Sequence, residues 1–168
     1  QNRGMSLTPV EVRAAGRRDW RALRVLRLEA LLDTPDAFGS TYEEALRRSR
    51  AQWKEMARAF NYFVAIRDGG FVGMASGGRH DSYPDTAWLY GMYVTPEQRG
   101  TNVADELVAR VAGWARGEGF DALYLDVATN VARARAFYQR MGFVETGERR
   151  SMTRDATLEL VTMRLELS

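Results

Sequence analysis

The spacing of hydrophobic residues along the chain changes several times, and each change predicts a new helix or strand. Apolar residues at helical spacing predict helices over residues 20–32, 42–59, 103–116 and 132–141. Apolar residues that alternate with polar ones, or that form short runs between turn residues, predict strands over residues 10–14, 62–67, 71–76, 87–94, 123–127, 143–146 and 157–167. This order of elements predicts an α+β fold with a mixed sheet flanked by helices.

Local signals refine the ends of these elements. Asp19 can cap the helix that follows it, and Asp68-Gly69 predicts a tight hairpin turn. Residues 79–85 are polar and are expected to form a loop between two strands. In the last strand the apolar phase slips, which suggests a β-bulge near Leu160.

Length and composition are those of one domain. The chain has 168 residues, of which 45% are hydrophobic, enough for one sizeable core. We expect a single domain over residues 5–168 and interpret residues 1–4, which precede Met5, as a remnant of cloning. No apolar run approaches the roughly 18 residues that span a bilayer, and no signal-peptide pattern opens the sequence. These features predict a cytoplasmic protein with no membrane partner.

Residues that commonly carry reactive or metal-binding groups are scarce. The chain has no cysteine, which excludes disulfides, a thiolate nucleophile and cysteine-ligated zinc. The single histidine, His80, argues against a histidine metal site and against a Ser-His-Asp triad, so we expect no metal. The net charge is +2, and the 24 basic residues are spread among the acids rather than clustered. This spread argues against a nucleic-acid partner.

Residues 94–104 have the composition of an anion-binding turn. Pro96 ends the preceding strand, and Gly100 and Asn102 tolerate positive φ just before an apolar-periodic helix. Backbone N–H groups at such a helix start point at a common ligand, which suits a phosphate or pyrophosphate. Arg99 can add a charge-assisted contact. On this segment alone, an ordinary strand–turn–helix junction is an equally good interpretation.

Residues 134–143 form a second informative segment, a short helix that ends in Gly-Phe and runs into a strand. Tyr138 shares a helix face with Phe137 and Met141, so taken alone it is more simply a core tyrosine. The segment follows the anion turn by about 30 residues. Together, in this order, the two segments favour a functional site over two unrelated structural junctions.

At these two segments the chain resembles the GNAT superfamily of N-acetyltransferases. Residues 99–104 follow that family's acetyl-CoA signature, Gln/Arg-x-x-Gly-x-Gly/Ala, and residues 134–143 follow its Ala-x-x-Phe/Leu-Tyr-x-x-x-Gly-Phe helix. The resemblance covers nearly all of residues 5–168, and residues 36–41 look like a bacterial subgroup whose substrates are unassigned. It implies a GNAT-like fold, with a mostly antiparallel central sheet of about seven strands flanked by four helices.

The resemblance implies a role for each matching residue. The pyrophosphate of acetyl-CoA would be held by backbone amides of Arg99, Gly100, Thr101, Asn102, Val103 and Ala104. The pantetheine arm would pair, like an added strand, with Met92, Tyr93 and Val94. The amide of Val94 would polarise the thioester carbonyl, and Tyr138 would protonate the departing thiolate.

Two departures from the family pattern concern acetyl-CoA. Asn102 replaces the first glycine of the signature, which would bring a side chain near the phosphates and lower the affinity for CoA. The asparagine that often lies seven residues before the tyrosine would fall at Val131, and Asn130 lies one residue earlier. Asn130 is therefore a candidate either for the pantetheine arm or for the cap of the following helix.

A third departure concerns the general base. The acidic residue that many relatives carry on the strand before the signature is Trp88 here, and the rest of that strand holds no carboxylate. An amine of pKa near 10 is mostly protonated at pH 7, so its proton needs an exit. A water relay to Asp85, Glu43 or Glu44 is one route, and an acceptor amine of low pKa is another.

Resemblance and composition together favour direct transfer from acetyl-CoA to an amine in a ternary complex. The acceptor is expected to bind near residues 38–42 and 79–85, with four aromatic contacts, Phe38, Tyr42, Trp88 and Tyr90. A small-molecule or peptide amine fits, so a polyamine, an antibiotic, an amino acid and a protein N-terminus all stay open. A homodimer is possible.

Two other functions also stay open. A CoA-binding module without catalysis would keep the anion turn and lack a base, and thiol release from acetyl-CoA across a panel of amines would separate it from an enzyme. An arginine-rich RNA- or ribosome-associated protein would be retained on heparin or RNA, with a steep dependence on salt.

Overall fold

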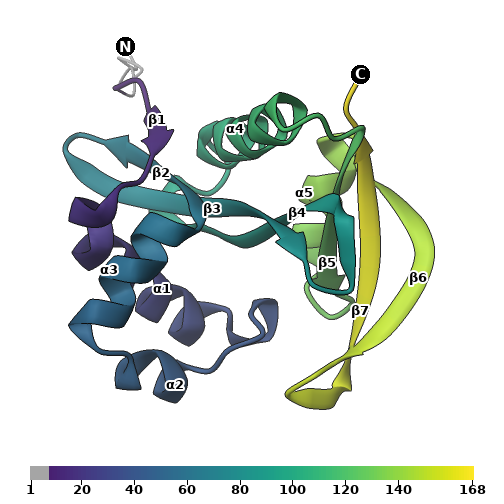
Figure 1. Ribbon diagram of the computed structural model, residues 1–168, viewed down its shortest axis with the longest axis horizontal. Helices are drawn as coiled ribbons and strands as arrows, with labels where there is room; N and C mark the ends of the chain where they lie inside the picture. The colour runs from purple at the N-terminus through teal and green to yellow at the C-terminus, as the bar shows by residue number, and fades with distance from the viewer. Residues whose placement is uncertain (1–7) are drawn as a thin grey trace, which may run out of the picture.

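Seven strands form one sheet, and helices cover both of its faces (Figure 1). The computed structural model describes residues 8–168. The strands are β1 (Glu11–Ala14), β2 (Asn61–Arg67), β3 (Gly70–His80), β4 (Tyr83–Val94), β5 (Ala122–Ala128), β6 (Val144–Met152) and β7 (Asp155–Glu166), in the order β1-β2-β3-β4-β5-β7-β6. Only β4 and β5 pair in parallel. The predicted α+β fold with a mostly antiparallel sheet is confirmed.

Five α-helices lie in two layers. They are α1 (Trp20–Asp33), α2 (Tyr42–Arg47), α3 (Arg50–Ala59), α4 (Val103–Gly117) and α5 (Ala132–Arg140). Phe63 and Ala65 of β2 pack with the core beneath α4 and α5, whereas Tyr62 and Val64 pack with α1, α2 and α3. Because alternate residues of a strand point to opposite faces, the two helix layers lie on opposite sides of the sheet. Figure 1 shows this arrangement.

The single helix predicted over residues 42–59 is wrong, because the chain leaves the helical conformation at Arg48, where ψ is 130°. The next helix has a start signal of its own. Ser49 Oγ accepts from the N–H of Gln52, and the Gln52 side chain accepts from the N–H of Ser49. This capping box makes two helices, α2 and α3, out of the predicted one.

Asp19 does not cap α1. Its carboxylate binds the Arg13 guanidinium at 2.8 and 3.0 Å and accepts the N–H of Gly16 at 2.8 Å. The hydrogen bonds from Arg13 and from the Gly16 N–H, with the charge of Arg13, hold the pKa of Asp19 below its usual range. Asp19 therefore ties β1 to the short 3₁₀ turn before α1.

Of two further expectations about the strands, the first is wrong and the second is confirmed. Residues 79–85 are no loop, because β3 and β4 form one long hairpin in which Arg79 pairs with Ala87 and His80 with Tyr83. The pairing of β6 with β7 is irregular at two places, in β6 around Gly147 and in β7 between Asp155 and Glu159. The second lies just before Leu160, where the bulge was expected, while β7 runs unbroken against β5. Consecutive residues 161–163 of β7 are all buried because both faces of the sheet are covered here: Val161 and Met163 pack in the core beneath α4 and α5, and Thr162 on the other face donates to Asp126.

Beyond Trp88 the pairing of β4 with β5 stops. Only Ala87 with Leu123 and Trp88 with Tyr124 are in register. Three residues later, Gly91 takes a positive φ of 59°, and the register of β4 against β3 shifts between Tyr90 and Tyr93. This bulge bends β4, so the two strands separate and leave a gap in the middle of the sheet.

On the edge away from β5, strand β4 pairs with β3, and close contact between β3 and α4 holds this part of the sheet in place. A Cβ at Gly77 would lie 2.4 Å from Cε3 of Trp114 in α4, so only glycine fits there without a shift of the indole ring. Val103 and Leu107 of the same helix are fully buried. The glycine in β3 therefore sets the distance between the sheet and α4.

Gly77→Ala should lower the free energy of unfolding by about 1–3 kcal/mol, the usual cost of overpacking a core. Urea denaturation would measure it. Gly113→Ala is the matched control, because a Cβ at this exposed helical position meets nothing within 4 Å; it should raise stability by about 0.5–1 kcal/mol. Equal effects of the two substitutions would contradict the role given to the Gly77–Trp114 contact.

Candidate active site

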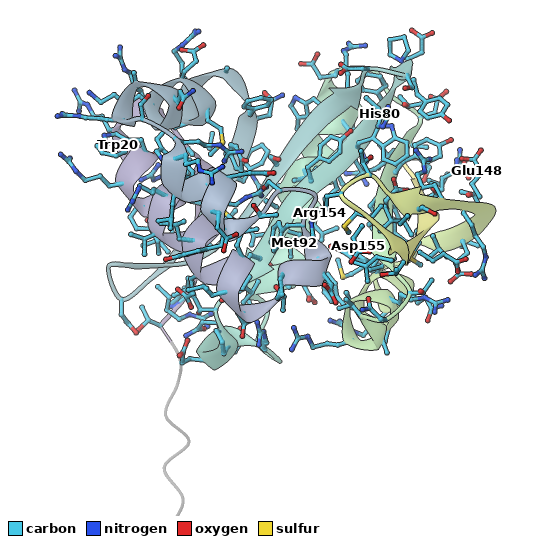
Figure 2. All side chains as sticks on the ribbon, turned by 90° about the horizontal axis from the view of Figure 1, so that it is seen from below. Trp20, His80, Met92, Glu148, Arg154 and Asp155 are labelled. Carbon is cyan, nitrogen blue, oxygen red and sulfur yellow. The ribbon has the colours of Figure 1, made fainter. Side chains whose placement is uncertain are left out.

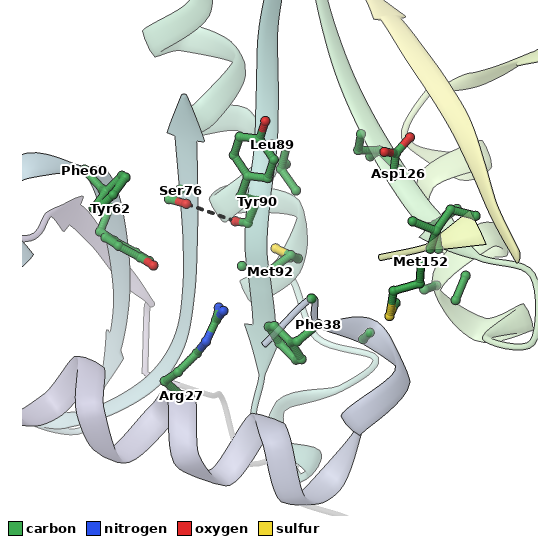
Figure 3. Close-up of a pocket in the computed structure, with 18 of the residues that line it drawn as sticks. Arg27, Phe38, Phe60, Tyr62, Ser76, Leu89, Tyr90, Met92, Asp126 and Met152 are labelled. Atoms are coloured by element: carbon green, nitrogen blue, oxygen red, sulfur yellow. Dashed lines mark hydrogen bonds between the residues drawn. The ribbon is translucent and has the colours of Figure 1, made fainter. Parts of the chain in front are cut away.

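A cavity of about 800 Å³ opens where β4 and β5 separate (Figure 3). Its walls come from these two strands, from α5, from the α1–α3 layer and from the β6–β7 hairpin. The residues of the sheet and α5 that line it are Tyr62, Ser76, Leu89, Tyr90, Gly91, Met92, Leu125, Asp126, Val127, Ala128, Ala134, Tyr138, Met152 and Leu160. A volume of this size is typical of small-molecule sites.

Tyr138 projects from α5 to this cavity and is only 8% exposed. Its ring packs edge-on against Phe143 at 5.6 Å, and no hydrogen bond within residues 8–168 engages its hydroxyl. Burial raises the pKa of Tyr138 above its usual value. The hydroxyl is therefore protonated at neutral pH and available as a donor toward the cavity.

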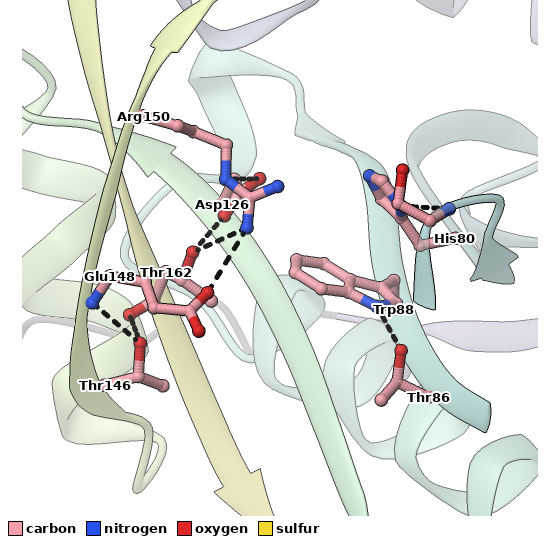
Figure 4. A network of polar contacts seen from close by, with 9 residues as sticks. His80, Thr86, Trp88, Asp126, Thr146, Glu148, Arg150 and Thr162 are labelled. Carbon is pink, nitrogen blue, oxygen red and sulfur yellow. Dashed lines mark hydrogen bonds and ion pairs between the residues drawn. The ribbon is translucent and has the colours of Figure 1, made fainter. Parts of the chain in front are cut away.

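Asp126 is a carboxylate in the same cavity, and sequence reasoning missed it. Its Oδ1 accepts a hydrogen bond of 2.6 Å from the Thr162 hydroxyl, and its Oδ2 lies 3.5 Å from Nε of Arg150 (Figure 4). Burial raises the pKa of the neighbouring Tyr90 to about 12, with the charge of Asp126 contributing. The one signal in the sequence was an acid inside an apolar strand, between Leu125 and Val127.

The acids that the sequence offered as proton acceptors lie elsewhere. Asp85, Glu43 and Glu44 are absent from the cavity wall, and the Glu44 carboxylate accepts the N–H of Thr41 in a capping box. The only other cavity carboxylate among the described residues is Glu55, which is exposed and paired with Arg58. Asp126 is therefore the best-placed proton acceptor.

The edge of β4 that faces the gap presents free backbone groups. The N–H of Thr95 donates to Val72 on the β3 side at 2.9 Å, so by alternation the groups of Val94 and Met92 face the gap. Of these residues, only Met92 reaches the cavity wall with its side chain. The hydroxyl of Tyr93 donates to Glu29 of α1 at 3.1 Å, so Tyr93 contributes to the helix layer instead.

Ahead of α4 the anion turn differs from its expected conformation. Gly100 does take a positive φ of 79°, but Asn102 has a φ of −81°, so the left-handed conformation expected for it is wrong. The Oδ1 of Asn102 accepts from the buried Arg67 at 3.0 Å, and Arg67 also donates to Gln98 at 2.6 Å. The Asn102 side chain therefore binds the protein beneath the turn rather than lying among the phosphates.

Three backbone amides of this turn are free to bind an anion. No hydrogen bond within residues 8–168 uses the N–H of Gly100, Asn102 or Ala104. The amides of the intervening residues already have partners: Arg99 donates to Pro96, Thr101 to Gln98, and Val103 to the Thr101 hydroxyl. The guanidinium of Arg99 binds Asp33 at the end of α1. The free amides and the buried Arg67 suit a pyrophosphate at the start of α4.

Of the four aromatic residues expected to contact the acceptor, Phe38 and Tyr90 line the cavity and Tyr42 and Trp88 do not. Trp88 lies where β4 still pairs with β5, ahead of the gap. It stacks on Tyr124 at 5.4 Å and donates from Nε1 to Thr86 at 2.7 Å (Figure 4).

Polar contacts between segments far apart in the sequence close the cavity on the side of the β6–β7 turn. Arg154, in the turn of the β6–β7 hairpin (Figure 2), donates to the carbonyl oxygens of Phe38 at 3.1 Å and Pro35 at 2.6 Å. Asn130 donates to Asp36 at 2.9 Å. The first turn of α5 has no side-chain cap, so Asn130 neither caps that helix nor reaches the cavity wall.

Comparison with protein families gives one decisive result: the model of the acetyltransferase (GNAT) family matches residues 25–143, well over half of the chain. The chain belongs to the GNAT family. It is therefore an N-acetyltransferase of a family that uses acetyl-CoA. The recognition drawn from the two sequence segments is confirmed.

The names of two relatives of this GNAT enzyme indicate that those proteins acetylate different acceptors. The N-alpha-acetyltransferase RimI of Mycobacterium tuberculosis is 31% identical over 113 residues, which cover 66% of this chain and 70% of that protein. An aminoglycoside N(6')-acetyltransferase type 1 of Salmonella typhimurium is 32% identical over 91 residues, which cover 50% of this chain and 62% of that protein.

Solved structures agree on the fold. The putative acetyltransferase yncA of Salmonella typhimurium, determined with acetyl-CoA, matches this GNAT enzyme with a TM-score of 0.78 at 21% identity, over 96% of this chain and 95% of that one. In the part of the chain that the structure describes, no group of three or more potential metal ligands occurs. No helix among residues 8–168 is long and apolar enough to cross a membrane.

Asn102→Gly, which restores the family's glycine, should lower the free energy of unfolding by about 1.5–3 kcal/mol, because the buried Arg67 loses an acceptor. It should weaken acetyl-CoA binding, because the turn is no longer tied down. Urea denaturation and calorimetric titration would measure the two effects. Tighter binding at unchanged stability would show instead that the Asn102 side chain obstructs the phosphates.

Proposed function

We propose that this enzyme transfers an acetyl group from acetyl-CoA directly to an amine within a ternary complex. The observation that carries the proposal is the gap between β4 and β5, which opens into a cavity lined by both Tyr138 and Asp126. Acetyl-CoA supplies an activated acyl group as a thioester. Since the chain has no cysteine, an acetyl-cysteine intermediate is excluded and direct transfer is the simpler route.

Free backbone groups in two regions of the protein bind two different parts of acetyl-CoA. The amides of Gly100, Asn102 and Ala104 hold the pyrophosphate at the N-terminus of α4, where the helix dipole favours negative charge. The open edge of β4 at Met92 and Val94 pairs with the amide groups of the pantetheine arm. The Val94 N–H then faces the thioester carbonyl and stabilises the negative charge that develops on its oxygen.

Asp126 and Tyr138 handle the two protons of the reaction. Asp126 accepts a proton from the ammonium form of the acceptor, directly or through water, because an amine of pKa near 10 is mostly protonated at pH 7. The neutral nitrogen attacks the carbonyl carbon, a C–N bond forms, the C–S bond breaks, and the nitrogen loses a second proton, which restores the Tyr138 hydroxyl after its own proton has gone to sulfur. The Tyr138 hydroxyl donates to the departing thiolate.

A CoA-binding module without catalysis gains no support from this geometry. That alternative depended on the absence of a carboxylate near the acetyl group, and Asp126 on β5 removes the reason for it. The amine acceptor enters from the α1–α3 side, where Phe38 and Tyr90 contribute aromatic surface.

Tyr138→Phe should lower kcat by roughly ten- to a thousandfold, within or just below the usual range for a general acid, with little change in the Kd of acetyl-CoA. Thiol release from acetyl-CoA would measure kcat. Since the pKa of Tyr138 is raised, the wild-type rate should not fall through ionisation of this tyrosine up to about pH 10. Tyr124→Phe removes a hydroxyl bound to Arg164, outside the cavity, and should leave kcat unchanged. An unaltered kcat in Tyr138→Phe would make Tyr138 a core residue.

Asp126→Asn should lower kcat/KM at pH 7 by about 10²–10⁴-fold, the range for loss of a general base. The deficit should shrink as the pH approaches the pKa of the acceptor amine, where the neutral amine no longer needs a base. A pH profile of both enzymes would measure it, with Asp85→Asn as a control of the same charge change on an exposed residue. A deficit that stays constant with pH would assign Asp126 a structural role.

A further inference from the structure

Arg27 is a cation on the apolar face of α1. Leu23 and Ala30, one turn before and after it, are almost fully buried. The guanidinium of Arg27 points from the helix into the cavity, between Tyr62 and Met92 (Figure 3). Its carbon lies 4.7 Å from the centre of the Phe38 ring.

The hydrogen-bonding capacity of Arg27 is largely unused. Nη2 donates to the Ser40 hydroxyl at 3.1 Å, Nε is buried without a partner, and Nη1 makes no hydrogen bond within residues 8–168. A Cβ on residue 91 would lie 3.2 Å from Nη1, so the glycine of the β4 bulge leaves this nitrogen uncovered. A ligand in the cavity can therefore reach Nη1.

No carboxylate of the described residues neutralises Arg27. A second arginine, Arg48, lines the same wall without an ion pair, and its closest polar partner is the sulfur of Met56 at 3.6 Å. Burial lowers the pKa of Arg27, and the charge of Arg48 lowers it further. The two carboxylates of the cavity are engaged elsewhere, Glu55 by Arg58 and Asp126 by Arg150.

We infer that Arg27, with Arg48 beside it, binds a carboxylate of the acceptor, so that the substrate is an amino carboxylate. This inference rests on the proposed function. Two adjacent N–H groups of a guanidinium match the two oxygens of a carboxylate, and a buried cation without a counter-ion favours an anionic ligand. The phosphates of CoA have their own site at the start of α4, on the opposite face of the sheet from α1.

The same geometry orients the acceptor. With its carboxylate at Arg27, the amine points across the cavity toward Asp126 and Tyr138. Phe60 and Met152 add apolar wall, which suits an aliphatic or aromatic side chain. A polycationic acceptor is disfavoured, because two unpaired arginines repel further positive charge.

Matched acceptors test the inference. The common L-amino acids and their α-amides would be compared as acceptors in the thiol-release assay, with wild type, Arg27→Gln and Arg24→Gln. Arg24, on the same helix, does not line the cavity and is the control for the loss of one charge. Wild type should prefer an acid over its amide, and Arg27→Gln should lower kcat/KM for the acid about ten- to hundredfold, chiefly through KM. The loss with the amides should be much smaller, because a neutral amide offers the guanidinium no charge to bind.

Binding is measured separately from turnover. In the presence of CoA, the preferred amino acid should raise the unfolding temperature of wild type and of Arg24→Gln but not of Arg27→Gln. Equal use of acids and amides, an equal loss for both in Arg27→Gln, or no stabilisation by any amino acid would overturn the inference. Faster turnover of amines without a carboxylate than of any amino acid would overturn it and leave the proposed function intact. Acetyl-CoA binding without turnover of any amine would instead contradict the proposed function.

Discussion

The missing hydrogen bonds between β4 and β5 are the feature on which the rest of the structure depends. A sheet interior normally pairs every backbone group, and an unpaired group away from water costs free energy. Here the pairing ends at Trp88 and Tyr124, and the bulge at Gly91 turns β4 away from its neighbour. The exposed edge of β4 is thereby free to pair with an extended molecule that has amide groups of its own, the role we propose for the pantetheine arm.

A gap in the middle of a sheet requires support from both faces. On one face α4 packs directly on β3, because Gly77 leaves room for the Trp114 ring. On the other, α1 packs beneath β4 and carries Arg27, and the tip of the β6–β7 hairpin is tied through Arg154 to Phe38 and Pro35. These ties join segments more than 100 residues apart in the chain. They hold the acceptor side of the cavity together without filling it.

Periodicity alone predicted the order of helices and strands, since each element buries one face. It failed where a local polar contact overrides the pattern, as at Ser49, whose capping box divides one apolar stripe between two helices. The turn before α4 was recognisable from Gly100, but the conformation of Asn102 depends on Arg67, 35 residues away in the chain. The sequence did not indicate Asp126, because the family resemblance places the general base on β4. Only the parallel pairing of β5 beside β4 brings Asp126 into the same cavity.

The charges around the cavity bear on whether the acceptor of a related enzyme also fits this one. An aminoglycoside carries several positive charges, and the enzyme of that name resembles only half of this chain. A site for such a ligand needs carboxylates, because each unpaired cation near it lowers affinity. Here the acceptor side instead presents Arg27 and Arg48, and Asp126 lies on the far wall. On the proposed function, a carboxylate bound at Arg27 leaves the amine of the same molecule facing Asp126 and the acetyl group.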